Sequence, residues 1–394
     1  MGSITQKNRR LFGNEINALA GINFVASFAT AAVATIWALY INSFTHNNAI
    51  TGFISSFLTL VSIISYFVFV PILEKTDRAN LFSLSLFLVA ISYLILSINK
   101  SFPIFMIVAI IMVSLYSLRI SALGIMIKNK SKIEDIAKNE GIIFTFLNLG
   151  WVVAPLIAGF VADKYNIHAV FDMAAILILL SLVFFKKSQI NDNHTKKQTD
   201  GNIKKNLIDF FKNKDRTISY IINGVAMSWW ILIFLFLPLY MIENGLTGKH
   251  IGIAFFFISL PLIIGEYYFA KLVHKKGFKK MFIIGFLIVT ICAFSAFFAT
   301  NIYFILGFVV LASFGMAMLE PLLQAYFLSI TNKSEVSRFY GPFSTSRDIF
   351  ELAIKIIASV ILLFLPFKSI FVFFGIIMFI MIFMSLRVRK VDSI

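Results

Sequence analysis

The sequence predicts an all-α membrane protein with twelve transmembrane helices in two six-helix bundles related by pseudo-two-fold symmetry. Of its 394 residues, 59% are hydrophobic and only 14% are charged, against about 25% charged residues in globular domains. The mean hydropathy is +0.89, which excludes a disordered chain and an ordinary soluble enzyme. Apolar runs long enough to cross a bilayer recur along the chain.

Twelve apolar runs, each bounded by polar residues, are the expected spans. The first six are residues 16–41, 50–73, 79–98, 102–127, 141–162 and 169–185. The second six are residues 217–242, 249–271, 281–300, 303–329, 341–365 and 367–386. The first run is too long for the hydrophobic region of a secretory signal, so we expect no cleavable signal peptide.

The basic residues predict the orientation. With a cytoplasmic N-terminus, 28 of the 35 Lys and Arg residues fall on inner segments, four on outer loops and three inside spans. By the positive-inside rule we expect both termini in the cytoplasm of a multi-pass plasma-membrane protein. The same bias explains the net charge of +16 through orientation and contact with anionic membrane lipid, so we expect no nucleic-acid partner.

One long polar stretch divides the chain. It predicts an N-terminal six-helix bundle at residues 1–186, a cytoplasmic central loop at 187–216 and a C-terminal six-helix bundle at 217–394. Residues 203–213 have the pattern of a short amphipathic helix at the inner membrane interface, and a flexible linker fits them equally well.

The two halves are related by an internal repeat. At an offset of about 200 residues, Gly52 aligns with Gly252 and Gly141 with Gly341. Two six-span halves of equal orientation predict a pathway between them near the bilayer midplane.

The loop after the second span carries Asp77 and Arg78, and the corresponding loop of the second half carries Gly277 before two lysines. These loops resemble the Gly-x-x-x-Asp-Arg-x-Gly-Arg motif of the major facilitator superfamily, although the first copy lacks both glycines and the last arginine. The resemblance implies a gating loop whose charge pairs clamp the halves in the outward-open state. A basic inner loop of the ordinary kind is the alternative interpretation.

The fifth span carries small residues and a proline that predict close helix packing with a bend: Gly150, Ala154, Pro155 and Gly159. This stretch resembles the Gly-x-x-x-Gly-Pro-x-x-Gly-Gly motif of drug–proton antiporters in the same superfamily, with two glycines replaced by alanine. The resemblance implies the drug/metabolite–proton antiporter branch.

Ionisable residues inside spans are the main candidates for function, because each costs about 2.5–3.5 kcal/mol at the bilayer centre and such residues commonly face a cavity. The candidate proton carriers are Glu351, Glu320, Asp348 and Glu266. The candidate substrate-binding cations are Arg119, Arg347 and Lys355. Three cations against four carboxylates leave one negative charge unpaired, and burial without a partner favours a protonated carboxyl.

Three of these residues are spaced to form a ladder. Arg347, Glu351 and Lys355 are four residues apart and therefore share one helical face. Glu351 lies about 15 Å into its span, and Arg119 and Glu320 have comparable depths, so we expect these groups to meet across a central cavity. Ion pairs that only hold helices together are the alternative.

Other residues inside spans are weaker candidates for substrate binding: Trp229, Trp230, Asn23, Tyr116 and Gln324. Each fits helix packing as well as a pathway lining. The five histidines lie in loops or at span ends, so we expect no metal site. No nucleotide-binding loop or catalytic triad stands out, and we expect no cofactor and no enzymatic activity.

Together these features predict a secondary transporter that moves a small solute by alternating access, with proton-coupled efflux of a drug or metabolite as the expected reaction. Proton-coupled uptake of a small organic anion or sugar is an alternative, because the cationic groups suit a carboxylate or phosphate. A lipid flippase on the same fold is another. We expect a monomer.

Overall fold

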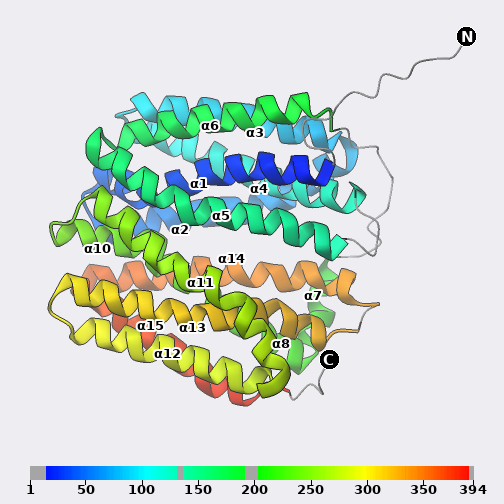
Figure 1. The fold of residues 1–394 in the computed structure, drawn as a ribbon, viewed down its shortest axis with the longest axis vertical. Helices are drawn as coiled ribbons and strands as arrows, with labels where there is room; N and C mark the ends of the chain where they lie inside the picture. Colours follow the sequence, from blue (N-terminus) through cyan, green and yellow to red (C-terminus); the bar gives the residue numbers. More distant parts are fainter. Residues whose placement is uncertain (1–14, 131–135, 191–202, 333, 390–394) are drawn as a thin grey trace, which may run out of the picture. The chain divides into compact units, whose positions relative to one another are not determined.

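The computed structural model describes residues 15–130, 136–190, 203–332 and 334–389, and all regular secondary structure in these ranges is helical (Figure 1). Within the described residues, 11 helices are long and apolar enough to cross a membrane. In a bilayer the backbone has no water to bind, so each apolar span satisfies its own polar groups as a helix. The chain is a multi-pass membrane protein.

Contacts divide the chain into two compact units, and each is described by itself. The first unit comprises residues 1–36 and 61–197. Its helices are α3 (Arg78–Ile98), α4 (Phe102–Lys130), α5 (Ile136–Lys164) and α6 (Ile167–Lys187), with the first part of α1 (Glu15–Thr45) and the second part of α2 (Asn48–Lys75). Helix α3 packs against both α4 and α6.

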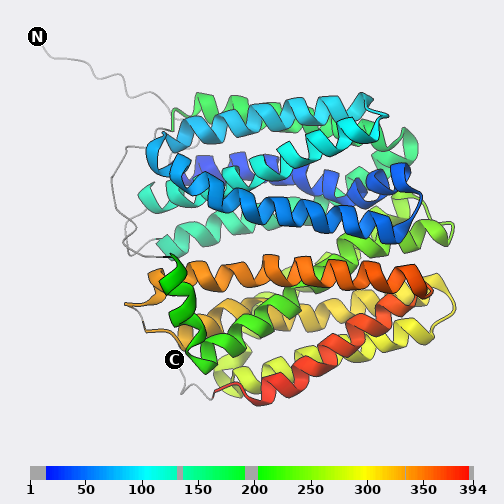
Figure 2. The ribbon, with the colours of Figure 1, turned by 180° about the vertical axis from the view of Figure 1, so that it is seen from behind.

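The second unit comprises residues 37–60 and 198–394, so it includes the end of α1 and the start of α2. Its other helices are α7 (Ile203–Phe211), α8 (Lys214–Met227), α9 (Trp229–Ile231), the π-helix η2 (Leu232–Phe236), α10 (Leu237–Glu243), α11 (Gly248–Lys276), α12 (Phe278–Phe298), α13 (Ile302–Ser329), α14 (Val336–Phe364) and α15 (Ser369–Leu386). Helix α12 packs between α13 and α15, and α7 contacts α14 (Figure 2).

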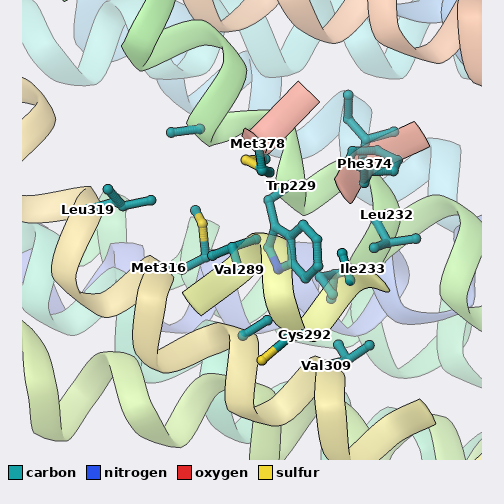
Figure 3. Close-up of a cluster of buried hydrophobic side chains, with 14 of the residues drawn as sticks. Trp229, Leu232, Ile233, Val289, Cys292, Val309, Met316, Leu319, Phe374 and Met378 are labelled. Carbon is teal, nitrogen blue, oxygen red and sulfur yellow. The ribbon is translucent and has the colours of Figure 1, made fainter. Parts of the chain in front are cut away.

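The core of the second unit surrounds Trp229, whose side chain is fully buried. Aliphatic, aromatic and sulfur-containing side chains from several helices contact it (Figure 3). The Phe374 ring meets the indole edge-on, with centroids 6.0 Å apart. Burial of these large side chains holds α8–α10, α12, α13 and α15 together through the hydrophobic effect and dispersion.

Eleven of the twelve predicted spans correspond to the eleven candidate membrane helices of the described ranges. The twelfth prediction, residues 341–365, falls on α14, a helix of 29 residues. Its central segment carries Arg347, Asp348, Glu351 and Lys355, which make it too charged to be assigned by apolarity alone. The twelve-helix, two-bundle arrangement and the domain boundaries at 186 and 217 stay predictions.

Local side-chain chemistry fixes several helix ends. Asp77 caps α3 by accepting hydrogen bonds from the backbone N–H groups of Ala79 (2.8 Å) and Asn80 (3.2 Å). Gly277 separates α11 from α12 with φ of +74°, a backbone conformation that side chains disfavour. Both ends fall within the two loops that the sequence singled out.

Candidate functional site

The candidate site of the second unit centres on the middle of α14, where Lys355 and Glu351 form an ion pair. Lys355 Nζ lies 2.6 Å from Glu351 Oε1, and the lysine is only 8% exposed. Lys355 also donates to Thr59 Oγ1 at 2.9 Å, and the Thr59 hydroxyl donates to Glu351 Oε1 at 3.4 Å. The three side chains, called the α14 triad below, form a polar cluster between α14 and α2.

Thr59 was not among the predicted site residues. It belongs to α2, in the segment that contacts assign to the second unit. A signal was present in the sequence, because Thr51, Ser55 and Thr59 are spaced four residues apart and therefore form a hydroxyl stripe on one helical face. The stripe alone does not identify the charged helix that it meets.

The remaining candidates of α14 lie outside the triad. Asp348 is half-buried and Arg347 is exposed, one turn before Glu351. Of the three residues of the predicted ladder, Glu351 and Lys355 are in direct contact. A role for the ladder in binding or proton transfer stays a prediction.

A second polar contact joins Glu320 of α13 to Trp230 of α9, whose indole N–H donates to the carboxylate. It lies beside a proline in α13 and next to the π-helix of the seventh span. Proline has no N–H, so Pro321 leaves the carbonyl four residues earlier without its helical donor. Pro238 in the seventh span also lacks an N–H to donate to the preceding turn. The π-helix η2 lies directly before it, and the Leu237 N–H donates to Leu232 O, five residues earlier. Such interruptions are frequent at functional sites.

Arg119 of α4 is the charged candidate of the first unit, and it is 4% exposed. Its Nη2 donates to the Thr30 hydroxyl at 3.1 Å, and its guanidinium carbon lies 5.4 Å from the centroid of the Tyr116 ring. Arg119 and the α14 triad belong to different units, so their meeting across one cavity stays a prediction.

The weaker candidates occupy separate places. Asn23 is buried and donates to Leu19 O of its own helix at 2.8 Å. Gln324 is exposed, 3.4 Å from the Tyr340 hydroxyl, and Trp229 belongs to the apolar core. The side chain of Glu266 lies outside the described residues.

Helix α5 approaches α1 closely at Gly150. A Cβ atom there would lie 2.9 Å from Phe28 N and 3.1 Å from Ser27 Oγ. The other residues of this predicted packing motif, Ala154, Pro155 and Gly159, are buried. Only a glycine lets the two backbones pack this closely.

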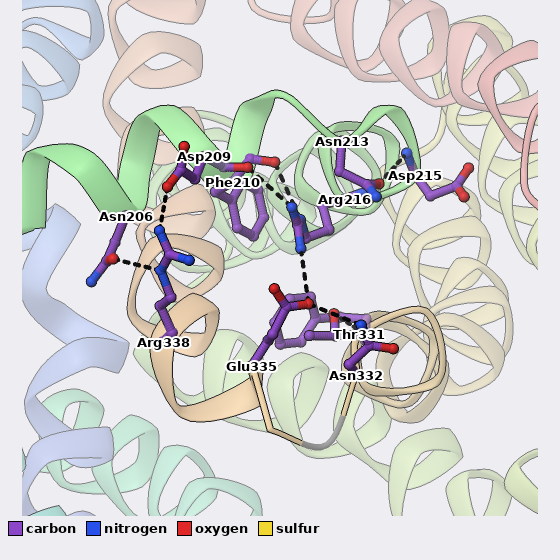
Figure 4. Close-up of polar contacts among 11 residues, drawn as sticks. Asn206, Asp209, Phe210, Asn213, Asp215, Arg216, Thr331, Asn332, Glu335 and Arg338 are labelled. Atoms are coloured by element: carbon purple, nitrogen blue, oxygen red, sulfur yellow. Dashed lines mark hydrogen bonds and ion pairs between the residues drawn. The ribbon is translucent and has the colours of Figure 1, made fainter. Parts of the chain in front are cut away.

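A further polar cluster, not predicted from the sequence, holds α7 against the rest of the second unit (Figure 4). Arg338 donates to Asn206 Oδ1 at 2.7 Å and pairs with Asp209. Arg216 donates to the backbone carbonyls of Asp209 (3.0 Å) and Phe210 (3.3 Å) at the C-terminal end of α7, where a cation also matches the helix dipole.

An aromatic cluster lies beneath this polar layer. Phe210 is fully buried among Tyr220, Phe327, Phe339 and Phe343, and the Arg216 guanidinium stacks on Phe339, 3.9 Å from the ring centroid. Of the two interpretations of residues 203–213, the helix is therefore correct for Ile203–Phe211.

Replacement of Asp209 by Asn should loosen α7, because it removes the charge that faces Arg338. A hydrogen bond from Lys212, assisted by Arg338, holds the pKa of the Asp209 carboxyl below its usual range. A carboxyl with a lowered pKa stabilises the docked state above its ordinary pKa and loses this effect only as the pH falls through the lowered value. The protection factor of α7, which is the intrinsic exchange rate divided by the observed rate, should therefore be constant between about pH 5 and pH 8 in the wild type, since the ordinary value is about 3.9.

In the same measurement Asp209→Asn should have lower protection factors in α7 throughout that range. Asp163→Asn, an exposed change at the end of α5, is the control and should match the wild type. Equal protection of α7 in Asp209→Asn and the wild type would show that the aromatic cluster alone holds the helix.

Comparison with known proteins decides the family. The profile of the Major Facilitator Superfamily matches residues 19–247 and 217–393. The chain belongs to the major facilitator superfamily. An uncharacterized MFS-type transporter of Methanocaldococcus jannaschii is 29% identical over 154 residues, which is 38% of this chain and 40% of that relative. The matched region thus spans less than half of the relative's length.

Solved structures of several transporters share the fold. The nucleoside transporter NupG superposes with a TM-score of 0.74 at 13% identity, covering 94% of this chain and 98% of that one. The peptide transporter POT, solved with sulfate, gives 0.70 at 13% identity over 96% and 95%. A bacterial homolog of the human lysosomal transporter Spinster gives 0.72 at 12% identity over 95% and 96%. Membership of the superfamily indicates a transporter and not an enzyme, and the solved structures, at 12–13% identity, show a shared fold.

Proposed function

We propose that this superfamily member is a proton-coupled secondary transporter of a small solute, working by alternating access in the plasma membrane with both termini in the cytoplasm. The observation that carries the proposal is the α14 triad. A lysine–glutamate pair in the interior of a membrane-length helix is expensive to keep in lipid, so a transport role is the simplest reason for it.

The triad suggests how a proton would act. While Glu351 is ionised, it neutralises Lys355 and accepts the Thr59 hydroxyl. Binding of a proton to Glu351 removes the negative charge, frees Lys355 from its partner and weakens the link between α2 and α14. The proton thereby changes both the local charge and the packing of two helices, which are the two requirements for coupling to a conformational change.

Glu320 is the second proposed proton carrier. Its carboxylate accepts from Trp230 beside the interruptions at Pro321 and η2. Protonation would weaken this charge-assisted bond between the seventh and tenth spans. The short segments of the seventh span would then be free to move relative to α13.

The small-residue motif of the fifth span supports efflux of a drug or metabolite as the direction. Uptake of a small organic anion is the second candidate, favoured by the buried cations Arg119 and Lys355. A pocket for lipophilic cations would be acidic and aromatic, so these two side chains weigh against a general multidrug pump.

Proton flux into reconstituted vesicles tests the coupling. A pH-sensitive dye inside the vesicles should report proton movement when members of a panel of organic anions, sugars and cationic drugs are added to the wild type. Glu351→Gln and Glu320→Gln should each abolish the solute-driven signal, because an amide cannot carry the proton. Asp163→Asn is the matched control and should retain it; unchanged flux in both glutamine variants would refute proton coupling through these residues.

A further inference from the structure

Arg119 is a buried cation whose described partners are all neutral. It lies in the interior of α4, 4% exposed. Its Nη2 donates to Thr30 Oγ1 at 3.1 Å, and the Thr30 hydroxyl in turn donates to Ala26 O at 2.9 Å. The guanidinium lies 5.4 Å from the centre of the Tyr116 ring, which adds a weak cation–π attraction.

These contacts leave the guanidinium incompletely satisfied. Arg has five N–H donors and stays protonated at any physiological pH. Among the residues that the structure describes, Nη1 is buried without a hydrogen-bond partner, and no carboxylate forms an ion pair with Arg119. Native proteins seldom leave a buried polar group in this condition, so each such case calls for an explanation.

Two lysines of the long helices have carboxylate partners. Lys130, at the end of the same helix, pairs with Glu15 at 3.0 Å, and Lys355 pairs with Glu351 at 2.6 Å. Arg119 is thus buried in the interior of its helix, and within the described residues no carboxylate lies within ion-pair distance of it. Leaving a guanidinium in this state is unfavourable in a membrane, and a bound anion would relieve it.

We propose that the transported solute carries an anionic group, a carboxylate or a phosphate, which binds Arg119 at Nη1 while Thr30 holds Nη2 in place. The inference rests on the proposed transport function and specifies its substrate class. Thr30 and Tyr116 orient the planar guanidinium, and the anion supplies the missing charge and acceptor. A neutral solute of the same shape would leave the charge uncompensated, so the site should discriminate strongly against it.

Matched pairs of probes test this proposal on the purified full-length protein. The pairs are benzoate and benzamide, nicotinate and nicotinamide, and ribose 5-phosphate and ribose. At pH 7 at least one anionic member should raise the melting temperature of the wild type, since a ligand of the folded state stabilises it, while its neutral partner has no effect. The carboxylate and phosphate arms identify which anion the solute carries.

Substitutions at and near Arg119 test whether its guanidinium is the group that binds the anion. Arg119→Gln should weaken binding of the active anion about tenfold or more, the loss expected for a charge-assisted hydrogen bond. Arg119→Lys keeps the charge without the planar fork, so it should fold and bind with intermediate affinity. Thr30→Val should weaken binding without removing it, and Lys130→Gln, which changes a cation on the same helix, should bind like the wild type.

Three results would overturn the proposal: no stabilisation by any anionic probe, equal stabilisation by both members of each pair, or unchanged anion affinity in folded Arg119→Gln and Arg119→Lys. Failure of the site is distinguishable from failure of transport. Solute-driven proton flux with neutral probes only would keep the transport function and reject the anion site. Arg119-dependent anion binding without solute exchange in vesicles would keep the site and reject the transport function.

Discussion

Lys355→Met is expected to lower the free energy of unfolding by about 3 kcal/mol and to abolish solute exchange, because it leaves the Glu351 carboxylate without its cation inside the membrane. The lysine is almost fully buried and contacts both other members of the triad. Thermal unfolding in detergent measures the first effect and exchange of labelled solute across vesicles the second.

A double variant separates folding from transport. In Lys355→Met/Glu351→Gln neither charge remains, so stability should return close to the wild-type value, since replacing both members of a buried pair is often nearly neutral. Solute exchange should stay absent, because the proton-carrying group is gone. If the double variant exchanges solute at the wild-type rate, the ion pair only stabilises the fold. The main support for the proposed function would then be lost.

Gly52→Ala is expected to destabilise the protein by about 1–3 kcal/mol, the usual effect of an overpacked contact. A Cβ atom at Gly52 would lie 2.0 Å from Ser359 Oγ and 3.2 Å from Ser359 Cβ. Ser359 has little freedom to move, because its hydroxyl donates to Lys355 O at 2.7 Å. The start of α2 would therefore have to separate from α14, two turns from Thr59. The melting temperature measures the effect.

Two further variants make this prediction specific. Ser359→Gly removes the atoms that the new methyl group would meet, so Gly52→Ala/Ser359→Gly should be more stable than the sum of the single changes predicts. Gly307→Ala in α13 is the control, because no atom beyond its chain neighbours and the adjoining backbone of its own helix lies within 4 Å of the position of its Cβ. If Gly52→Ala melts like Gly307→Ala, α2 and α14 are not in tight contact at this point.

Much of the fold could be predicted because a membrane leaves the backbone few choices. Each long apolar run forms a helix, and polar residues such as Asp77 mark the ends. The interruption of the seventh span was not predicted, although Pro238 was visible, because a proline can bend, kink or end a helix depending on its neighbours. The grouping of residues 37–60 with the second unit depends on tertiary contacts that apolarity does not encode.

The candidate site could also be predicted only in part. Contacts within one helix follow from spacing, so the four-residue interval between Glu351 and Lys355 predicted that they could meet. Contacts between helices do not: Thr59 and Thr30 were missed, and Glu320 and Trp230 were chosen separately without the bond that joins them. A hydroxyl or indole in an apolar span has many packing roles, and only the fold selects its partner.

The chain contains one cysteine, Cys292, and its thiol is buried in the core around Trp229 (Figure 3). Thiol-reactive reagents act on accessible thiolates, so the buried Cys292 thiol of the native protein should react with maleimides only very slowly. Spin labels or fluorophores can therefore be attached at newly introduced surface cysteines without first removing a native one. The motions on which a carrier depends can thus be followed by distance spectroscopy in an almost unmodified protein.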